Sequence, residues 1–468
     1  MSFERYHEAV DYLQRRLWHE LPIVPVERAL QSRIRTLLAH VGDPHTRFPV
    51  VHVGGSAGKG STATIAASLL QAAGLRTGLY TSPHLQTFIE RIDVDGTLIA
   101  PERFADLVLG LDPLVRKMHI EVLDGVGFGR PSLVEVAFAV AMKHFADEQI
   151  DVAVIEVGLG GRTDYTNVFD EHIAASTILT NIEYEHTERL GATLKSIARE
   201  KSAIIHGGPV VTGAMRADAL RVIEERCAET DADLRRLGRE IKVRPRGYDR
   251  GASTFDVVVP DRSLRNLRLP LSGAHQQTNA ALAIAVLLRT DTARALWDDP
   301  AAIQRGLDAV RLNCRLEVMQ QDPVVLLDGA HNPVEARRVA DALSTHYLRD
   351  GARAHLVVGI LADKDQAAMV RQFARVASSV TVTQPPLGER IGDPDRMLHL
   401  FERALGAANV TFEPSPERAL DRALADTPRD GIVCVTGSMF LVGALRNRWL
   451  PEQTILERRS AAFAPDDA

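Results

Sequence analysis

A glycine-rich loop, HVGGSAGKGST at positions 52–62, is the segment of the sequence with the clearest chemical meaning. It follows the strand-like run PVVHV and precedes the helix-like run TATIAASLLQAAG. Such a loop turns backbone N–H groups toward a phosphate chain at a helix N-terminus, where the helix dipole also favours negative charge. Lys59 would add a cation and Ser61 a hydroxyl for Mg²⁺. Gly60 stands between them, so the loop departs by one residue from the common P-loop pattern.

Three more polar groups follow predicted strands. Ser82 comes after RTGLYT, Glu156 lies near the end of DVAVIEV, and His186 follows ASTILTNI. Ligands of open parallel sheets bind outside the carboxyl ends of the strands, so we expect these groups to meet the phosphate loop at one edge. Glu156 closes a run that is apolar on both faces, which favours a buried cation as its partner over a surface position. His186 taken alone is typical of an ordinary loop histidine, and only its position at this edge makes it a candidate ligand.

Lys201 lies on the apolar stripe of a predicted helix. The run TLKSIAREKSAII places it in register with Leu194, Ile197 and Ala198, a spacing that turns one helix face toward the core. Two interpretations stay open here. The stem could pack while the amine reaches water, or a partly buried neutral amine could react with carbon dioxide to give a carbamate, which would turn a cation into a metal ligand.

The second half of the chain carries three further motifs. GAHQQTNA begins a predicted helix and contains Asn279, CRLEV contains Arg315, and LLDGAHNP reads as strand, tight loop and helix. Asp328 and His331 in the last motif therefore lie at a carboxyl edge as well, although ordinary turn and cap chemistry also accounts for such residues. Arg315 taken alone is typical of a surface charge at a domain junction.

The elements that position these groups alternate between strand and helix, which predicts an α/β protein with largely parallel sheets. PVVHV, RTGLYT, DVAVIEV and ASTILTNI form a first series of strands, and PVVLLD, HLVVGIL, SVTVT and GIVCVTG form a second. We expect a P-loop parallel-sheet domain over residues 1–310, followed by a smaller doubly wound, Rossmann-like domain over residues 311–468. Two accessory elements are also predicted, a hairpin in IDVDGTLI and a strand in TFDVVVPD.

The composition excludes several classes of protein. Of the 468 residues, 45% are hydrophobic and 25% charged, and a net charge of -6 argues against a nucleic-acid binder. The three cysteines are too few for a disulfide framework, so we expect a reducing cytoplasm. The N-terminus is charged and no apolar run approaches the ~18 residues of a membrane span, so neither export nor insertion is expected. We expect the tail ERRSAAFAPDDA to be mobile.

Eight motifs together resemble those of the folylpolyglutamate synthases and dihydrofolate synthases, a branch of the Mur-type ATP-dependent amide ligases. In chain order the motifs are GSAGKGS, TSPHLQTFIERI, EVGLGGRTDYTN, EHTERLG, REKSAII, GAHQQTNA, CRLEV and LDGAHNP. The resemblance covers nearly the whole chain, and eight motifs in order are far more specific than any one of them. It implies that the first domain binds ATP and that the second is the glutamate ligase domain.

The resemblance also implies roles for individual residues. The ATP site would comprise Gly58, Lys59, Gly60, Ser61, Thr62, Asn279, Arg315, Asp328 and His331. Two Mg²⁺ ions would be held by Ser61, Ser82 and Glu156 and by His186 and Lys201, the lysine as N6-carboxylysine. The catalytic groups would be Lys59, His186, Lys201 and Arg315. Substrate-binding positions would be Ser82, Ser132, Arg162, Thr163 and Asp164, the last four at the pterin site of members that use dihydropteroate.

The reaction implied by the resemblance joins L-glutamate to a folate-type carboxylate through an acyl phosphate. The acceptor would be dihydropteroate, a reduced folate, or both. A Mur-type ligase for a different carboxylate and amino acid is one alternative, and a nucleotide-dependent switch or binding protein is another. The acidic, imidazole and lysine groups at the predicted metal edge argue against a pure switch. We expect a monomer with small-molecule substrates, without nucleic-acid or membrane partners.

Overall fold

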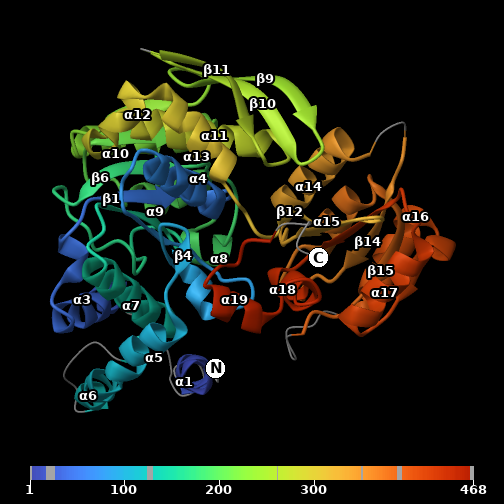
Figure 1. Ribbon diagram of the computed structural model, residues 1–468, viewed down its shortest axis with the longest axis horizontal. Coiled ribbons are helices and arrows are strands. Elements are labelled where there is room, and N and C mark those ends of the chain that lie inside the picture. The colour runs from blue at the N-terminus through green and yellow to red at the C-terminus, as the bar shows by residue number, and fades with distance from the viewer. Residues whose placement is uncertain are drawn as a thin grey trace.

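The computed structural model describes residues 3–16, 27–123, 130–260, 262–348, 351–386 and 393–463. It contains two α/β domains that lie side by side (Figure 1), each built around its own sheet. The first sheet has eight strands in the order β4-β3-β2-β5-β1-β6-β7-β8. Its parallel strands are β1 (Val50–Gly54), β2 (Thr77–Tyr80), β5 (Val152–Glu156), β6 (Ala174–Leu179), β7 (Pro209–Thr212) and β8 (Asp233–Arg236). The predicted hairpin forms the antiparallel edge as β3 (Ile92–Val94) and β4 (Thr97–Leu98).

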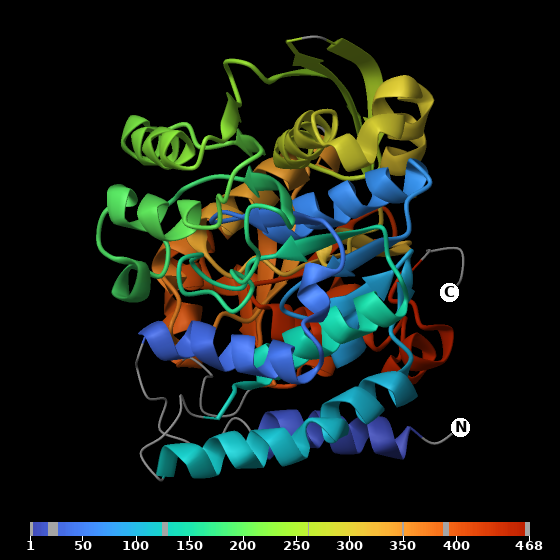
Figure 2. The same ribbon diagram turned by 90° about the vertical axis from the view of Figure 1, so that its left-hand side faces the viewer.

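The central strand β1 is buried on both faces, as a continuous apolar run predicts. Val51 and Val53 pack in one core with helices α4 and α11, whereas Val50 packs in another with α7. In Figure 2 the blue and cyan helices α1, α3, α5 and α6 lie below the sheet, whereas the blue helix α4 lies above it with the yellow helices α11 to α13. The helices of this domain are α1 (Glu4–Asp11), α3 (Glu27–His40), α4 (Lys59–Ala72), α5 (Pro101–Gly110), α6 (Asp112–Leu123), α7 (Leu133–Asp147), α8 (Thr187–Leu190), α9 (Leu194–Ser202), α10 (Ala217–Glu229), α11 (Ala274–Leu287), α12 (Arg294–Asp298) and α13 (Pro300–Ala309).

A three-stranded antiparallel sheet covers α11 at the top of the first domain (Figure 1). Its strands are β9 (Lys242–Asp249), β10 (Ala252–Val259) and β11 (Arg262–Leu269), in the order β11-β10-β9. Phe255 and Val257 of the middle strand are fully buried in the core that α4 and α11 share. The sequence predicted only this middle strand, because the flanking runs KVRPRGYD and RSLRNLRL lack the apolar alternation of a strand.

The second domain has a six-stranded sheet in the order β12-β13-β17-β14-β15-β16. The four predicted strands are present as β13 (Val324–Asp328), β14 (Ala354–Val358), β15 (Ala377–Val382) and β17 (Ile432–Thr436), all parallel. Two further strands lie at the edges, β12 (Arg315–Gln321), which is antiparallel, and β16 (Val410–Phe412). The helices are α14 (Pro333–His346), α15 (Gln366–Phe373), α16 (Pro394–Leu405), α17 (Pro416–Asp426), α18 (Met439–Arg446) and α19 (Glu452–Arg458). This confirms the α/β architecture with two domains.

The end of the chain returns to the first domain. Leu450, Ile455, Leu456 and Ala461 are buried in the core that contains α7, and the Leu98 N–H donates to the Arg459 carbonyl at 2.9 Å. The prediction of a mobile tail is therefore wrong as far as residue 463, because apolar side chains in this segment pack against the first domain. The last five residues of the predicted tail lie outside the described residues. The predicted boundary at residue 310 falls between α13 and β12.

No helix in the described ranges is long and apolar enough to cross a membrane.

Candidate active site

The phosphate loop predicted from the sequence lies between β1 and α4. Gly58 is the N-cap of α4 and has a left-handed backbone with a φ of 86°, which favours glycine at this turn. Asn181, just after β6, accepts a hydrogen bond from the Ala57 N–H at 2.8 Å. Gly55 has no room for a side chain, because an added Cβ would lie 2.0 Å from Thr180 Oγ1. The segment after β6 therefore fixes the conformation of the loop.

The charged and hydroxyl groups of the loop lie in the first turn of α4. Lys59 is the first residue of the helix, and its ammonium donates to the Ser56 carbonyl at 3.5 Å. Ser61 is 4% exposed. The Thr62 hydroxyl and the Thr62 N–H both donate to the Gly58 carbonyl, at 2.8 and 2.9 Å. Thr62 therefore stabilises the start of the helix and has no free N–H for a phosphate.

Glu156 lies beside this turn at the end of β5. Its carboxylate accepts a hydrogen bond from the Ser82 N–H at 2.8 Å, and the residue is 5% exposed. Burial raises the pKa of Glu156, whereas Lys59, the Ser82 hydrogen bond and Arg315 act in the opposite direction. An added Cβ on Gly60 would lie 3.4 Å from both carboxylate oxygens. The extra glycine of the loop therefore leaves room beside Glu156.

Lys201 lies on the apolar stripe of α9, as predicted, and the structure shows that it is buried there. Its ammonium lies 2.6 Å from the Glu185 carboxylate and donates to the Gly55 carbonyl at 2.9 Å. Burial lowers the pKa of Lys201 to about 8, with a further contribution from Lys59 and an opposing one from Glu185. The amine thus reaches the phosphate loop, and it does not extend to water.

His186 lies at the same edge but is more open than Lys201. It is the N-cap residue of α8 with a left-handed backbone, and its ring is 42% exposed, 3.7 Å from the Glu188 carboxylate. Burial lowers its pKa, which favours the neutral ring that a metal ion requires. His186 directly follows Glu185, whose carboxylate pairs with Lys201. The same short segment therefore carries both the histidine and the partner of the lysine.

Two amides of α11 contact the phosphate loop from the other side. Asn279 lies so close to Gly58 that an added Cβ on the glycine would meet its Oδ1 at 2.8 Å. The Asn279 amide donates to Gln276 Oε1 at 2.9 Å, and Gln276 in turn donates to Ser61 Oγ at 3.5 Å. The motif GAHQQTNA therefore supplies two polar residues to the loop, of which the sequence indicated one.

Arg315 reaches this region from the second domain. The residues on either side, Cys314 and Leu316, have left-handed backbones with φ values of 59° and 49°. The Cys314 N–H donates to the Glu317 carboxylate and the Leu316 N–H to the Asp328 carboxylate, each at 2.9 Å. Two carboxylates therefore hold an unusual backbone conformation around Arg315, of the kind that clusters at functional sites.

Asp328 and His331 lie at the carboxyl end of β13. Asp328 is 6% exposed and accepts hydrogen bonds from two backbone N–H groups, each at 2.9 Å. These bonds are turn chemistry, yet burial raises the pKa of the same carboxyl to about 6. His331 Nδ1 lies 3.0 Å from the Gly329 carbonyl and 3.2 Å from the Glu335 carboxylate. The helix start is as predicted, with Pro333 at the first position of α14.

Two adjoining cavities bring some of these residues together. Six of the predicted site residues described above line neither cavity: Lys59, Thr62, His186, Lys201, Asn279 and His331. We call the first the inner cavity; it lies between the domains and is lined by Gly58, Ser61, Gln276, Arg315, Asp328 and Glu335. The second, the outer cleft, has a volume of about 410 Å³ and is lined by Gly60, Ser61, Ser82, Glu156, Arg315 and the C-terminal residues 460–462. Because Ser61 and Arg315 line both, the two cavities meet between the phosphate loop and the second domain.

Comparisons with known proteins agree with this geometry. The glutamate ligase domain of Mur ligases matches residues 314–439, and the Mur ligase middle domain matches residues 131–287. A folylpolyglutamate synthase of Lacticaseibacillus casei is 33% identical over 449 residues, which are 95% of this chain and 99% of that protein. The chain belongs to the folylpolyglutamate synthase and dihydrofolate synthase family. The family resemblance of the eight motifs is thereby confirmed.

Further relatives include longer proteins and solved structures of this synthase family. A Haloferax volcanii protein named probable bifunctional folylpolyglutamate synthase/dihydropteroate synthase is 36% identical over 456 residues, and the chain spans 50% of its length. Mycobacterium tuberculosis folylpolyglutamate synthase complexed with ADP has a TM-score of 0.83 at 28% identity, covering 96% of this chain and 99% of that one. A folylpolyglutamate synthase complex with AMPPCP and folate has a TM-score of 0.76 at 32% identity, covering 95% and 99%.

The four positions matched to the pterin site of this synthase family lie apart from the two cavities. Ser132 is the N-cap of α7, and its hydroxyl donates to Glu135 at 2.7 Å. Arg162 donates to Glu200 at 2.8 Å, and Thr163 is partly buried in the same loop. The Asp164 carboxylate is 5% exposed and accepts hydrogen bonds from Leu159, Thr166 and the Thr166 hydroxyl, so it holds its own loop together. Ser132, Arg162 and Asp164 thus have structural partners within the chain.

The donor groups fit Mg²⁺ unequally at the two expected positions. Ser61, Ser82 and Glu156 line one cleft, with room beside Gly60. Lys201 is an ammonium donor as it stands, so it would fit a metal only as the carbamate. Within the described ranges no group of three or more His, Cys, Asp or Glu side chains forms a metal site. That is compatible with Mg²⁺, which usually takes one or two carboxylates and completes its shell with water and phosphate oxygens.

Several site residues have no local signal in the sequence. Glu185 contacts Lys201, and Asn181 contacts the phosphate loop. Glu185 begins the motif EHTERLG, but only His186 of that motif was given a role, and Asn181 belongs to none of the eight motifs. Glu335 and Arg338 line the inner cavity from α14, where their spacing is that of an ordinary amphipathic helix. Only the position of Glu185 and Asn181 after β6, at the carboxyl edge, could have indicated them.

Proposed function

We propose that the protein is an ATP-dependent ligase that joins L-glutamate to a folate-type carboxylate. The observation that carries the proposal is that the phosphate loop and Glu156 of the first domain line the same cleft as Arg315 of the second domain. A site of this kind can hold a phosphoryl donor at the loop and an acceptor in the outer cleft. Membership of the synthase family, and the nucleotide and folate complexes of its relatives, support the choice of substrates.

The phosphate chain of ATP would lie against the loop at the N-terminus of α4. Gly58 and Gly60 would contribute backbone N–H groups, Thr62 would hold the helix start through its bonds to the Gly58 carbonyl, and Lys59 would turn from the Ser56 carbonyl toward the phosphates. Asn279, Asp328 and His331 would complete the nucleotide site, with Gln276 and Glu335 as further wall residues of the inner cavity. Arg315 would offset the negative charge of the transferring phosphoryl group.

The reaction would proceed in two displacements. An oxygen of the acceptor carboxylate attacks the γ-phosphorus, the bond from phosphorus to the ADP oxygen breaks, and an acyl phosphate forms. The neutral amine of L-glutamate then attacks the acyl carbon, phosphate leaves with the bonding electron pair, and the amine loses a proton as the amide forms. Because water would intercept the acyl phosphate, the nearly buried positions of Ser61 and Glu156 favour the productive path.

Two Mg²⁺ ions are part of the proposal. Ser61, Ser82 and Glu156 would hold one, and His186 with a carbamate on Lys201 would hold the other. When bound, the ions would withdraw charge from the phosphate oxygens. The carbamate would also reverse the charge at Lys201, which as an ammonium would repel cations at short range in a buried site.

The acceptor would be dihydropteroate, a reduced folate, or both. Dihydropteroate use rests on Ser132, Arg162, Thr163 and Asp164, of which three have partners within the chain. Reduced folate use rests on the outer cleft and on the family. We expect the enzyme to act as a monomer in the cytoplasm, where its three free, buried cysteines stay reduced.

Product formation with each acceptor, ATP and L-glutamate tests the proposal. The purified protein should release ADP and phosphate only when both acceptor and glutamate are present. Lys59→Ala should lower kcat by at least about 10²-fold because one cation at the transferring phosphoryl group is lost. Lys195→Ala, which removes an exposed lysine of α9, is the matched control and should be fully active. A wild-type protein inactive with both acceptors, or an active Lys59→Ala variant, would contradict the proposal.

A further inference from the structure

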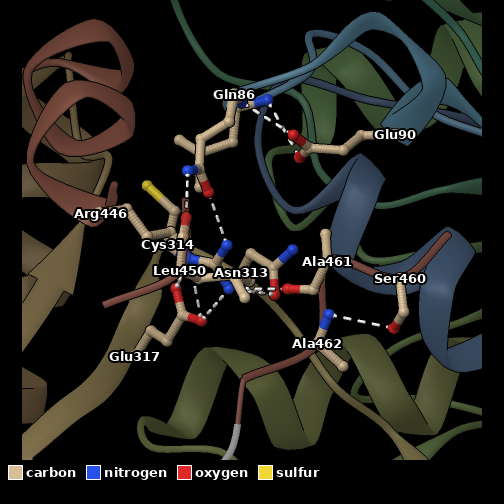
Figure 3. A network of polar contacts seen from close by, with 11 residues as sticks. Gln86, Glu90, Asn313, Cys314, Glu317, Arg446, Leu450, Ser460, Ala461 and Ala462 are labelled. Atoms are coloured by element: carbon tan, nitrogen blue, oxygen red, sulfur yellow. Dashed lines mark hydrogen bonds and ion pairs between the residues drawn. The ribbon is translucent and has the colours of Figure 1, made fainter. Parts of the chain in front are cut away.

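Arg446 of α18 is a fully buried arginine that links four segments of the chain (Figure 3). Its Nη1 donates to Gln86 Oε1 at 2.6 Å, and its Nη2 donates to the Ala461 carbonyl at 2.7 Å. Nε and Nη2 donate to the Glu317 carboxylate at 2.9 and 2.6 Å, and Nη2 also approaches Asn313 Oδ1 at 3.3 Å. The planar guanidinium suits such divergent acceptors, which one lysine ammonium would not reach together.

One arm of this cluster holds the loop that follows β2, residues 82–91. The Gln86 amide donates to the Leu450 carbonyl at 2.8 Å and to Asn447 Oδ1 at 3.1 Å. Helix α18 touches the loop backbone as well, because an added Cβ on Gly443 would lie 2.3 Å from the Leu85 carbonyl oxygen. The loop of the first domain is therefore seated on a helix of the second domain.

The loop itself is built to transmit this contact. The Glu90 carboxylate accepts hydrogen bonds from the N–H groups of Leu85, Gln86 and Thr87 at 3.2, 2.8 and 2.7 Å. At the other end of the loop, the Ser82 N–H donates to Glu156. Residues 81–85 and Glu90 line the outer cleft, so the loop forms one wall of the acceptor side of the site.

The second arm of the cluster supports Arg315. Glu317, which pairs with Arg446 at 2.6 Å, also accepts the hydrogen bond from the Cys314 N–H at 2.9 Å. A left-handed backbone is unfavourable at a residue with a side chain, and Cys314 and Leu316 both adopt it. The Glu317 contact is therefore one of the interactions that keep Arg315 in the cavity.

We propose that Arg446 is a positioning residue that sets the acceptor loop and Arg315 relative to each other. The loop faces the acceptor carboxylate, and Arg315 faces the phosphoryl group. From α18, Arg446 bonds to Gln86, which holds the loop, and to Glu317, which holds the backbone next to Arg315. This inference rests on the proposed function, since it concerns the same two displacements. Arg446 itself lines neither cavity. It acts through Gln86 and Glu317, and it also bonds to Asn313 and Ala461, which line the outer cleft.

Two variants separate the arms. Gln86→Ala removes the loop arm without disturbing the buried Arg446–Glu317 pair, so it should fold normally. Arg446→Lys keeps a positive charge beside Glu317 but cannot serve all four acceptors. Each should raise the acceptor KM and lower kcat, with a combined loss in kcat/KM of about tenfold or more for a hydrogen bond to a charged group. The dissociation constant for ATP should stay unchanged. Gln86, Glu317 and Arg446 do not line the inner cavity, and only Arg315 connects the cluster to it.

Arg448→Lys is the matched control. Arg448 lies two residues further along the chain, with its side chain 44% exposed beside Asp421, and its substitution should leave all constants unchanged. Amide exchange gives a second readout, because the N–H groups of Leu85, Gln86 and Thr87 should exchange faster in Gln86→Ala and Arg446→Lys than in the wild type.

The outcomes divide cleanly. Unchanged acceptor KM and kcat in both variants would overturn the inference, and so would an equal loss of ATP affinity, which would indicate general destabilisation. If the wild-type protein ligates neither acceptor, the proposed function fails. Amide exchange at residues 85–87 then decides by itself whether Arg446 holds the loop. Unchanged exchange in Arg446→Lys would show that the arginine does not hold the loop.

Discussion

The Gly60→Ala variant should affect the stability of the phosphate loop and the rate of ligation in opposite directions. Gly60 is the second residue of α4, and its backbone is not in the left-handed region, so alanine can adopt the same conformation. An added Cβ would lie 3.4 Å from both oxygens of Glu156, which is ordinary van der Waals contact. The protein without ligands should therefore accept the methyl group. The space beside the carboxylate, however, would be filled.

The two effects have opposite signs. Alanine is a better helix former than glycine, so the free energy of unfolding should rise, by at most about 1 kcal/mol. A methyl group in the gap would displace a phosphate or cation there by on the order of 1 Å. A shift of that size costs about 10²-fold in rate, or about 2.7 kcal/mol of transition-state stabilisation. We therefore expect a variant that is slightly more stable and about 10²-fold slower.

Urea denaturation without ligands and kcat/KM for ligation measure the two effects. Gly110→Ala is the matched control, because Gly110 ends α5 and an added Cβ there meets nothing within 4 Å. It should leave kcat/KM unchanged. Full activity of Gly60→Ala would refute the argument that this glycine makes room beside Glu156, and a marked loss of stability would refute the geometry of the loop.

Three further predictions concern single residues of the site. Arg315→Ala should reduce kcat more than ATP affinity, because Arg315 meets the phosphoryl group from the second domain; titration calorimetry and ligation kinetics check this, and equal constants for variant and wild type would contradict it. Lys201→Ala should lose ligation and regain part of it with short carboxylates, whereas Lys201→Arg should not be rescued; a crystal structure with metal bound that shows a bare ammonium would refute the carbamate. Asp328 has a pKa raised to about 6. Between about pH 4 and about pH 6 the folded state therefore keeps a proton on this carboxyl that the unfolded chain has lost. The free energy of unfolding of the wild type should fall as the pH rises through this range. Asp328→Asn should lack this fall, up to about 3 kcal/mol, in urea denaturation without nucleotide, and parallel pH profiles of the two proteins would contradict the shift.

Local patterns in the sequence predicted the elements and residues whose environment is set by their own neighbours. Lys201 was predicted to lie on the apolar face of its helix because three apolar residues share that face, and the structure confirms this. Whether the amine reaches water was left open by the sequence. The phosphate loop and Glu156 follow buried strands, and they meet because parallel strands share a carboxyl edge. In β9, by contrast, Arg244, Pro245 and Arg246 interrupt any apolar alternation, so the strand depends on pairing with β10.

Residues that act across the domains could not be predicted in this way. Arg446 contacts Gln86, which is 360 residues away in the sequence, and a single arginine near the end of a short helix carries no pattern. Arg315 resembles a surface charge until β12 pairs with β13 and the second domain closes one side of the cavity. The tail prediction failed for the same reason, since Ala461 is buried in the core of the first domain and Phe463 packs against it.

Three ionisable groups of the site, Glu156, Asp328 and Lys201, share a feature that the fold by itself does not explain. Burial raises the pKa of Glu156 and of Asp328 and lowers the pKa of Lys201, so in each case the folded protein disfavours the charged form. Such groups reduce the free energy of unfolding, and apolar residues of similar size would serve the cores better. Phosphates and cations bound nearby would add charged partners to those that the chain supplies, which are Glu185 for Lys201 and backbone N–H groups for Glu156 and Asp328. The concentration of these three groups on the loop side, the strand end and the second domain is therefore the electrostatic signature of a site whose ligands supply further charges.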